Sequence, residues 1–495
     1  MKRIFFSLII VFLVSSGNII RSQEIKELSF DDVIELAEQQ SLQAILAKHM
    51  FRANYWQFRT FKAEYLPSLT LRGTLPEYSR IYEKEYNYNT GNETYVEKNS
   101  NSISGQLSLS QNIGLTGGNI SLESDFRRFD VIGPDGSTQQ YISTPISINY
   151  NQPLLRFNEF KWQKEIEPLK YEEAKKNYLE SVEEVHVSAV RRFFQLALAQ
   201  INMEIANMNY ANADTLYNIA QGRYNLGTIA ENELLQMELS FLNAETSRNE
   251  AYNNLNDMKQ RLASFLGFTE NVEIKLVIPD DIPAFDVNAD KVLNLALENN
   301  PEMLSLDIQL LEAERDVAQA RAEKGLNANM NISFGLQGQS DIIPGAYQAL
   351  DDQQRISIGF TLPIMDWGLR RGRFRMAQSS QEVTRTQVQQ SVIDFEQQLF
   401  LDVAQFNLQE NQVRIAAKSD TVAMKMYEVT KQRFLIGNVD VLELNNADTK
   451  KDENRRGYIQ ALQNYWTYYY NIRRLTLFDF ESDNPIEADF DALVE

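Results

Sequence analysis

An internal repeat is the feature that most limits what this chain can fold into. The segment Ile146–Ile148 recurs at Ile356–Ile358, an offset of 210 residues. The same offset, without a gap, pairs Pro153, Ile205, Ala206, Tyr217, Arg223, Gly227, Glu233 and Leu234 with Pro363, Ile415, Ala416, Tyr427, Arg433, Gly437, Glu443 and Leu444. One register held over some 90 residues rarely arises by chance, so we expect two equivalent structural halves.

Each half is expected to begin with a helix. Ser29 is followed three residues later by Asp32, which is a helix start signal, and Asn288 is the corresponding cap in the second half. A weaker match at an offset of 259 residues links these two helices. The two offsets differ by 49, so the first half carries about 49 extra residues before Ile146.

Long helices are expected in both halves. Residues 169–278 and 364–484 lack proline, and apolar residues within them recur every three or four positions. A helix over residues 158–226 would be roughly 100 Å long at 1.5 Å per residue, so it needs neighbours along its whole length. Gly227 and Gly437 interrupt the pattern, which predicts helical hairpins over about 158–267 and 366–477.

The segments before each hairpin alternate with a period of two. Apolar residues lie on one face, and Ser, Asn, Gln and Thr lie on the other, over about residues 66–152 and 327–363. Four strands are expected from the first half and two from the second. Long links are predicted around residues 78–100 and 133–139, with a tight link at 114–118. The apolar face meets either a soluble core or lipid, and the pattern alone allows both.

Composition excludes several classes of function. The chain has no cysteine and only two histidines, so disulfides, thiolate metal sites and a cysteine nucleophile are excluded, and we expect no metal site. The net charge of −20 argues against nucleic-acid binding. Acid pairs such as Asp31-Asp32 lack an orienting partner, so we predict no catalytic residues, no enzyme activity and no cofactor.

The N-terminus resembles a signal peptide. Lys2 and Arg3 precede an apolar run, Ile4–Val14, and small residues follow it. The run is about half the length that a membrane-spanning helix needs. We therefore expect residues 1–22 to be removed as the protein leaves the cytoplasm.

Taken in order and in duplicate, the motifs resemble those of the TolC-like outer-membrane efflux protein family. The strand-to-helix junctions that carry the resemblance are 151–156 and 362–368, the hairpin turns are 223–227 and 433–437, and the first helix-to-strand exit is 66–69. The resemblance covers nearly the whole mature chain. It implies a first repeat over 23–268, a linker over 269–287, a second repeat over 288–480 and an acidic tail over 481–495.

The resemblance also implies an architecture and a function. Family members are homotrimers in which an outer-membrane β-barrel continues into a periplasmic α-helical coiled-coil tunnel, an α+β membrane protein. The expected function is the passive exit duct of a tripartite efflux pump or a type I secretion system. A periplasmic adaptor and an inner-membrane pump would be its partners. Members commonly supply four strands per protomer, whereas six here give either an eighteen-stranded barrel, which we favour, or a hairpin outside a twelve-stranded one.

Functional residues are carried over by position from the hairpin turns. Counting from Gly437, Glu443 matches an acid that rings the narrow periplasmic end, and Phe434 matches a gate aromatic. Asn446 stands where a second acid can occur, and Asp440 and Glu233 are lesser gate candidates.

The hairpin tips are the expected adaptor contacts. The residues concerned are Gly227, Thr228, Gly437 and Asn438.

A periplasmic coiled-coil adaptor is the alternative function, although an adaptor would need one hairpin rather than two equivalent halves. A secreted enzyme with coiled-coil extensions is a second alternative.

Overall fold

The computed structural model describes residues 25–87, 91–133, 136–268, 273–279, 282–283, 285, 287–436 and 438–494. The predicted signal peptide, eight of the nineteen residues of the predicted linker, and Gly437 lie outside these ranges. The chain divides into two compact units. We call them the helical unit (residues up to Leu46, Val182–Asp286 and Gln405–Asn471) and the sheet unit (Ala47–Ser181, Val287–Ala404 and Ile472 onward).

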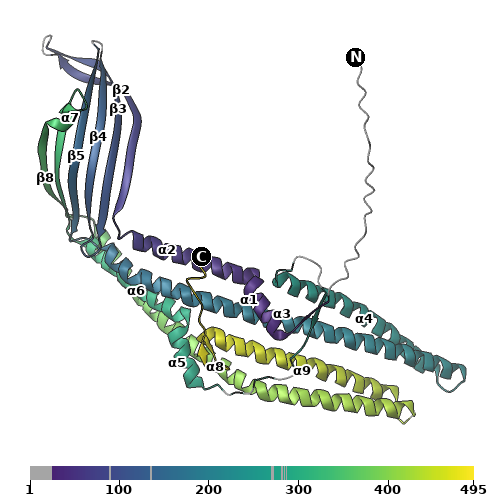
Figure 1. Cartoon of the computed structure of the whole chain (residues 1–495). Helices are drawn as coiled ribbons and strands as arrows, with labels where there is room; N and C mark the ends of the chain where they lie inside the picture. Colours follow the sequence, from purple (N-terminus) through teal and green to yellow (C-terminus); the bar gives the residue numbers. More distant parts are fainter. Residues whose placement is uncertain are drawn as a thin grey trace, which may run out of the picture. The chain divides into compact units, whose positions relative to one another are not determined.

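The sheet unit contains one six-stranded antiparallel sheet (Figure 1). Its strands are β2 (Ser68–Asn87), β3 (Asn92–Ile113), β4 (Gly118–Gly133), β5 (Gly136–Leu154), β7 (Asn327–Ser340) and β8 (Leu350–Thr361). They lie in the order β2-β3-β4-β5-β7-β8, so the four strands of the first half pair directly with the two of the second. The extra hairpin of the first half therefore belongs to the sheet.

The predicted long links between strands are wrong. The segment Glu77–Asn87 pairs residue by residue with Asn92–Ser102, and Gly133 pairs with Gly136. Cross-strand ion pairs explain why so polar a segment forms strands: Arg80 binds Glu97 at 2.7 Å and Lys98 binds Glu83 at 2.9 Å. Four tyrosines, a residue type that favours strands, also lie in these segments: Tyr78, Tyr82, Tyr86 and Tyr95.

Four long helices account for the two proline-poor stretches. They are α3 (Glu159–Asn225), α4 (Glu231–Phe265), α8 (Leu369–Leu435) and α9 (Val441–Thr476). Each pair follows the order expected of a hairpin. The helix α3 begins before Pro168 and continues through it, so this proline does not mark the boundary that sequence rules assign to it.

Shorter helices open each half as predicted. The helix α1 (Phe30–Gln40) has a capping box made by Ser29 and Asp32. The helix α5 (Ala289–Asn299) is capped by Asn288 and is followed by α6 (Pro301–Lys324). Both cap predictions are confirmed. A further helix, α2 (Leu42–Ala63), leads into the sheet.

The core of the helical unit forms where α1 meets α3 and α9. The Phe30 ring lies 5.3 Å from that of Phe193 and 4.6 Å from that of Trp466. A parallel pair of short strands, β1 (Ile25–Leu28) and β6 (Glu273–Leu276), lies in the same unit. This packing fixes the start of the first half against both hairpins.

The C-terminal segment packs within the sheet unit. After the short strands β9 (Phe478–Asp479) and β10 (Asn484–Pro485), the ring of Phe490 lies 5.3 Å from Phe51 of α2. Arg52 Nε donates a hydrogen bond of 2.6 Å to the carbonyl of Leu493. The acidic segment predicted as a tail is thus attached to α2.

No helix among the described residues is both long enough and apolar enough to cross a bilayer.

Candidate functional site

The sheet places apolar and polar side chains on opposite faces. The strand register aligns Leu69, Leu109, Leu122, Ile148 and Phe334 in one row across five strands. The next row along the strands is Ser68, Ser110, Ser121, Asn149 and Ser333. We call these the apolar and the polar face. The apolar face also includes Leu71, Leu107, Ile146, Leu336, Ile356, Ile358 and Phe360.

Side chains of the apolar face are exposed. Leu71 is 80% exposed, Phe360 74% and Ile358 62%. A folded protein in water rarely leaves an apolar surface of this extent uncovered. The sequence pattern allowed the apolar face to meet either a soluble core or lipid. The described residues build no core against this face, which argues against the first possibility.

The polar face carries ladders of hydrogen bonds between small side chains. Asn151 Nδ2 donates to Asn331 Oδ1 at 2.6 Å, and Ser333 Oγ donates to Asn149 Oδ1 at 2.7 Å. Short amide and hydroxyl side chains leave room beside them and tolerate water. This face suits the lining of a wet passage.

The sheet ends in two edge strands. β2 and β8 each pair on one side only among the described residues, and they run antiparallel to each other because six strands alternate in direction. An unpaired edge exposes backbone donors and acceptors, which cannot be left unsatisfied in a membrane. Another copy of β2 can pair with β8 in the ordinary antiparallel manner.

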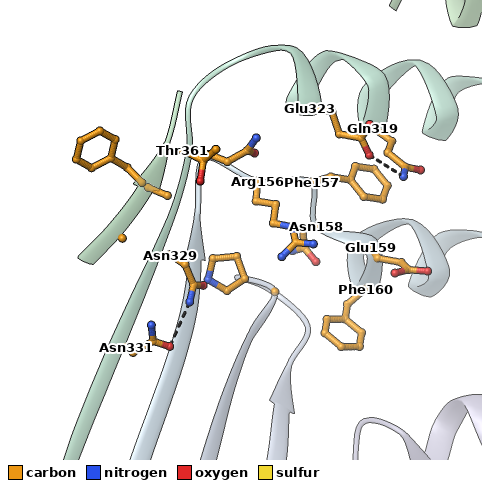
Figure 2. Close-up of a pocket in the computed structure, with 16 residues that line it drawn as sticks. Arg156, Phe157, Asn158, Glu159, Phe160, Gln319, Glu323, Asn329, Asn331 and Thr361 are labelled. Carbon is orange, nitrogen blue, oxygen red and sulfur yellow. Dashed lines mark hydrogen bonds between the residues drawn. The ribbon is translucent and has the colours of Figure 1, made fainter. Parts of the chain in front are cut away.

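A cavity of about 760 Å³, lined by both polar and apolar residues, lies where the strands meet the helices. Figure 2 shows side chains from β7, β8, α6, the start of α3 and the segment before it, with Glu323 on α6 and Arg156 and Asn158 on that segment. Asn329 and Asn331 extend the polar face into this cavity, where they are hydrogen-bonded at 3.2 Å. The passage-lining chemistry of the sheet therefore continues at its helical end.

The two strand-to-helix junctions share an unusual backbone. Leu155 and Trp367, although not glycines, have φ values of 54° and 53°. Trp367 is 90% exposed, so its ring does not pack at the junction.

The hairpin tips of the helical unit have the same turn in both halves. The backbone N–H of Thr228 donates to the carbonyl of Arg223 at 3.0 Å, and that of Asn438 donates to the carbonyl of Arg433 at 2.9 Å. Gly227 supplies the left-handed residue, with φ of 72°. Thr228 and Asn438 are exposed.

The acidic residues after the second turn have distinct local roles. Asp440 Oδ1 accepts a hydrogen bond of 2.8 Å from the backbone N–H of Glu443, so it caps α9. Glu443 is half-exposed and lies 3.5 Å from Arg433 Nη1. This exposed ion pair stabilises the fold by less than about 1 kcal/mol, but Arg433 offsets part of the negative charge that Glu443 was predicted to bring to a gate.

A cavity of about 420 Å³ lies between the two hairpins near their tips. It brings together three predicted gate residues: Glu233, Phe434 and Asp440. Phe434 also packs against the cluster formed by Tyr427, Leu444 and Ala447, so its ring joins α8 to α9. Glu443 and Asn446 do not line this cavity; both are exposed on α9.

Comparison with protein-family models decides the family. The model described as outer membrane efflux protein matches residues 119–268 and 292–476, which is more than half of the chain.

This chain belongs to the outer membrane efflux protein family.

Solved structures share the fold of this efflux protein. The CmeC outer membrane channel of Campylobacter jejuni is 16% identical, with 94% of this chain and 88% of that chain covered and a TM-score of 0.67. The outer membrane protein VceC of Vibrio cholerae is 13% identical, with coverages of 92% and 97% and a TM-score of 0.57. The outer-membrane channel OprN is 15% identical, with coverages of 90% and 89% and a TM-score of 0.63. A search of curated protein sequences gave no significant match.

Membership gives this efflux protein its location and its function. It is an outer-membrane channel, and its family is one of passive efflux channels rather than enzymes. The alternative of a periplasmic adaptor is wrong, because the family match covers both halves including their hairpins. Among the described residues, no group of three or more acidic or histidine side chains is arranged to hold a metal ion.

A buried charged cluster in the helical unit of the efflux protein was missed by sequence reasoning. Lys451 is buried and lies 2.6 Å from Asp448 and 3.2 Å from Asp452, with its Nζ 4.2 Å from the centre of the Tyr427 ring. Asn209 of α3 donates to Asp452 at 2.8 Å, so the cluster joins the two hairpins. The sequence gives only a partial signal: Lys451 continues the three-and-four spacing of Leu444 and Ala447.

The cluster favours retention of protons. Burial opposes the charge of Lys451, but the hydrogen bond and charge of Asp448, together with Asp452, outweigh it and raise the pKa of the amine. Burial raises the pKa of Asp448 despite its bond to Lys451. Both directions follow from two carboxylates sharing one buried cation.

Proposed function

We propose that three copies of this efflux protein join their sheets edge to edge into one eighteen-stranded barrel in the outer membrane. The observation that carries the proposal is the exposed apolar face bounded by two unpaired edges, β2 and β8. Closure would satisfy both edges and place the apolar face against lipid. The polar face would then line a water-filled lumen. Six strands in one sheet support eighteen rather than twelve.

The helical hairpins form the periplasmic part of the duct in this proposal. The two-repeat division, 23–268 and 288–480, supplies two hairpins per protomer, and three protomers supply a ring of six. The exposed hairpin tips, with Leu226 and Ile436 at their ends, dock a periplasmic adaptor. The adaptor connects the duct to an inner-membrane pump of the efflux or type I secretion class.

The closed end of the duct is lined by the acids that follow the second turn. Glu443 in three copies places like charges around one axis, which attracts cations. Glu233, Phe434 and Asp440 line the cavity between the hairpins. Asn446 adds no charge to this ring. The pairing of Arg433 with Glu443 would reduce the repulsion among the three Glu443 carboxylates.

Trimer formation is tested by the mass of the detergent-solubilised protein. We expect the mass of three chains, each somewhat below the 57.1 kDa of the full sequence because residues 1–22 are removed, from light scattering corrected for detergent. We also expect discrete conductance steps in planar bilayers. A particle with the mass of one chain that stays dissolved without detergent would refute the proposal.

Adaptor docking is tested separately at the hairpin tips. The double variant Leu226→Asp and Ile436→Asp should lose co-purification with the adaptor while it keeps the trimer. The matched control is Leu242→Asp, which changes a half-exposed leucine on α4 well away from the tip. Equal retention of adaptor by the tip variant and by the control would count against docking at the tips.

A further inference from the structure

The segment between β7 and β8, Asp341–Ala349, lies on the face of the sheet that is otherwise exposed. It contains the short helix α7 (Gly345–Gln348), drawn against the sheet beside β5 in Figure 1. Ser143 of β5 donates a hydrogen bond from its buried hydroxyl to the carbonyl of Ala346. A Cβ atom at Gly338 of β7 would collide with that same carbonyl oxygen. The segment is thus fastened to two strands.

The strand register identifies the face as the apolar one. Phe126, Ser143 and Gly338 form one row across β4, β5 and β7. Gly338 follows Phe334 by four residues and Phe126 follows Leu122 by four, so each pair lies on one side of its strand. The Phe334–Leu122 row belongs to the apolar face. The segment therefore covers the end of the surface that meets lipid.

The position along the strands places the segment at the far limit of that surface, on the side away from the helices. One row beyond Phe126, Arg128 pairs with Asp130 at 3.0 Å on β4. Farther along, β2 and β3 carry the cross-strand pairs of Arg80 with Glu97 and Lys98 with Glu83. Apolar residues thus give way to charged ones directly beyond the segment.

The segment presents apolar side chains outward. Ile342 is 63% exposed, Ile343 48% and Tyr347 45%. The Tyr347 ring stacks on Phe126 with centroids 6.3 Å apart and planes at 12°. Exposed aliphatic side chains together with an aromatic ring that carries a polar tip are the side chains found at a membrane interface.

We propose that the segment Asp341–Ala349 is a lipid anchor that inserts Ile342, Ile343 and Tyr347 into the outer leaflet, at the boundary between headgroups and acyl chains. Continuity with the lipid-facing sheet identifies lipid as the occupant, so the inference rests on the proposed orientation of that sheet. The anchor also has a structural reason. β7 has 14 residues and β8 has 12, whereas β2 to β5 have 16 to 22. The segment extends the apolar band above the two shorter strands.

The test uses spin labels, because the natural chain has no cysteine. Full-length Ile343→Cys is labelled with a nitroxide and reconstituted into vesicles of phosphatidylethanolamine and phosphatidylglycerol. The label's collision rates with oxygen, which concentrates in lipid, and with a water-soluble nickel chelate are compared. Ile358→Cys on the apolar face and Thr94→Cys at the far end of the β2–β3 hairpin are the lipid and water references.

We expect the oxygen-to-nickel ratio at Ile343 to exceed that at Thr94 at least fivefold and to approach that at Ile358. A ratio equal to that at Thr94, while Ile358 remains high, overturns the anchor and leaves the channel proposal intact. Low collision with both reagents indicates contact with protein and also overturns the anchor. A low ratio at Ile358 itself overturns the orientation of the sheet. Ile342→Cys repeats the measurement from an adjacent position.

Discussion

The buried histidine of the helical unit predicts a pH-dependent stability. His186 on α3 lies between two carboxylates, with Nδ1 3.3 Å from Glu183 of α3 and Nε2 3.3 Å from Glu38 of α1. The ring of Tyr470 on α9 packs against it at 5.6 Å. Burial opposes the charged imidazolium, but the hydrogen bonds and charges of the two glutamates outweigh burial and raise the pKa of His186 to about 9.

The raised pKa fixes both the sign and the size of the effect. A pKa that rises from 6.5 in the unfolded chain to about 9 in the folded one stabilises the fold by about 3 kcal/mol. That contribution is fully present below pH 6.5 and disappears as the pH rises through 9, because the folded state binds the proton more tightly. His186→Gln removes the charge and therefore this part of the pH dependence.

The measurement is thermal unfolding, followed by the circular dichroism of the helices at fixed detergent concentration between pH 6 and pH 10. It compares the pH dependence of stability in wild type and His186→Gln. We expect the wild-type midpoint to fall by several degrees more than that of His186→Gln over this range. His49→Gln is the matched control, because His49 is exposed on α2 and should leave the wild-type slope unchanged. A midpoint difference between wild type and His186→Gln that stays constant across the pH range would refute the reasoning.

Three further predictions concern the hairpins and the sheet. Gly227→Ala should destabilise the hairpin by about 1–2 kcal/mol, because φ is 72° at this residue. The control Gly222→Ala, inside α3 with open space around its Cβ, should stabilise the protein slightly. The midpoints of urea unfolding measure both effects. Lys451→Met should lower the free energy of unfolding by about 3 kcal/mol, because two carboxylates lose their buried cation. An unchanged midpoint in the same urea titration would contradict this prediction. Ile358→Arg should lower the yield of folded protein in outer membranes, since a lipid-facing arginine costs about 2–4 kcal/mol, while Ser357→Arg on the polar face should not; equal yields would exclude lipid contact at Ile358.

The helices and the repeat were predictable because their signals are local. A capping box needs only Ser29 and Asp32, and a long helix is indicated by apolar residues spaced three or four positions apart and by few prolines. Pro168 lies inside α3, within the span predicted from residue 158. Its disruption is confined to one turn of a 67-residue helix whose remaining turns outweigh it.

The polar ends of β2 and β3 and the burial of Lys451 were not predictable, because sequence does not show which residues face each other across two strands or which side of a helix a neighbouring helix covers. A charged residue such as Glu83 suggests a loop when it is considered alone. The strand becomes plausible only once Lys98 is known to pair with it from the neighbouring strand. Phe434 matched a gate position, yet its packing against Tyr427 and Leu444 depends on how α8 meets α9. Lys451 interrupts an apolar stripe, and sequence alone does not tell whether such a lysine reaches solvent or is buried among carboxylates.

The central claim is that lipid covers the apolar face of the sheet while water reaches the polar face. Single cysteines at positions 355 to 360 of β8, tested one at a time in outer-membrane vesicles with a charged, water-soluble thiol reagent, measure it most directly. The account predicts fast modification at Arg355, Ser357 and Gly359 and protection at Ile356, Ile358 and Phe360. Equal modification at neighbouring positions would contradict it.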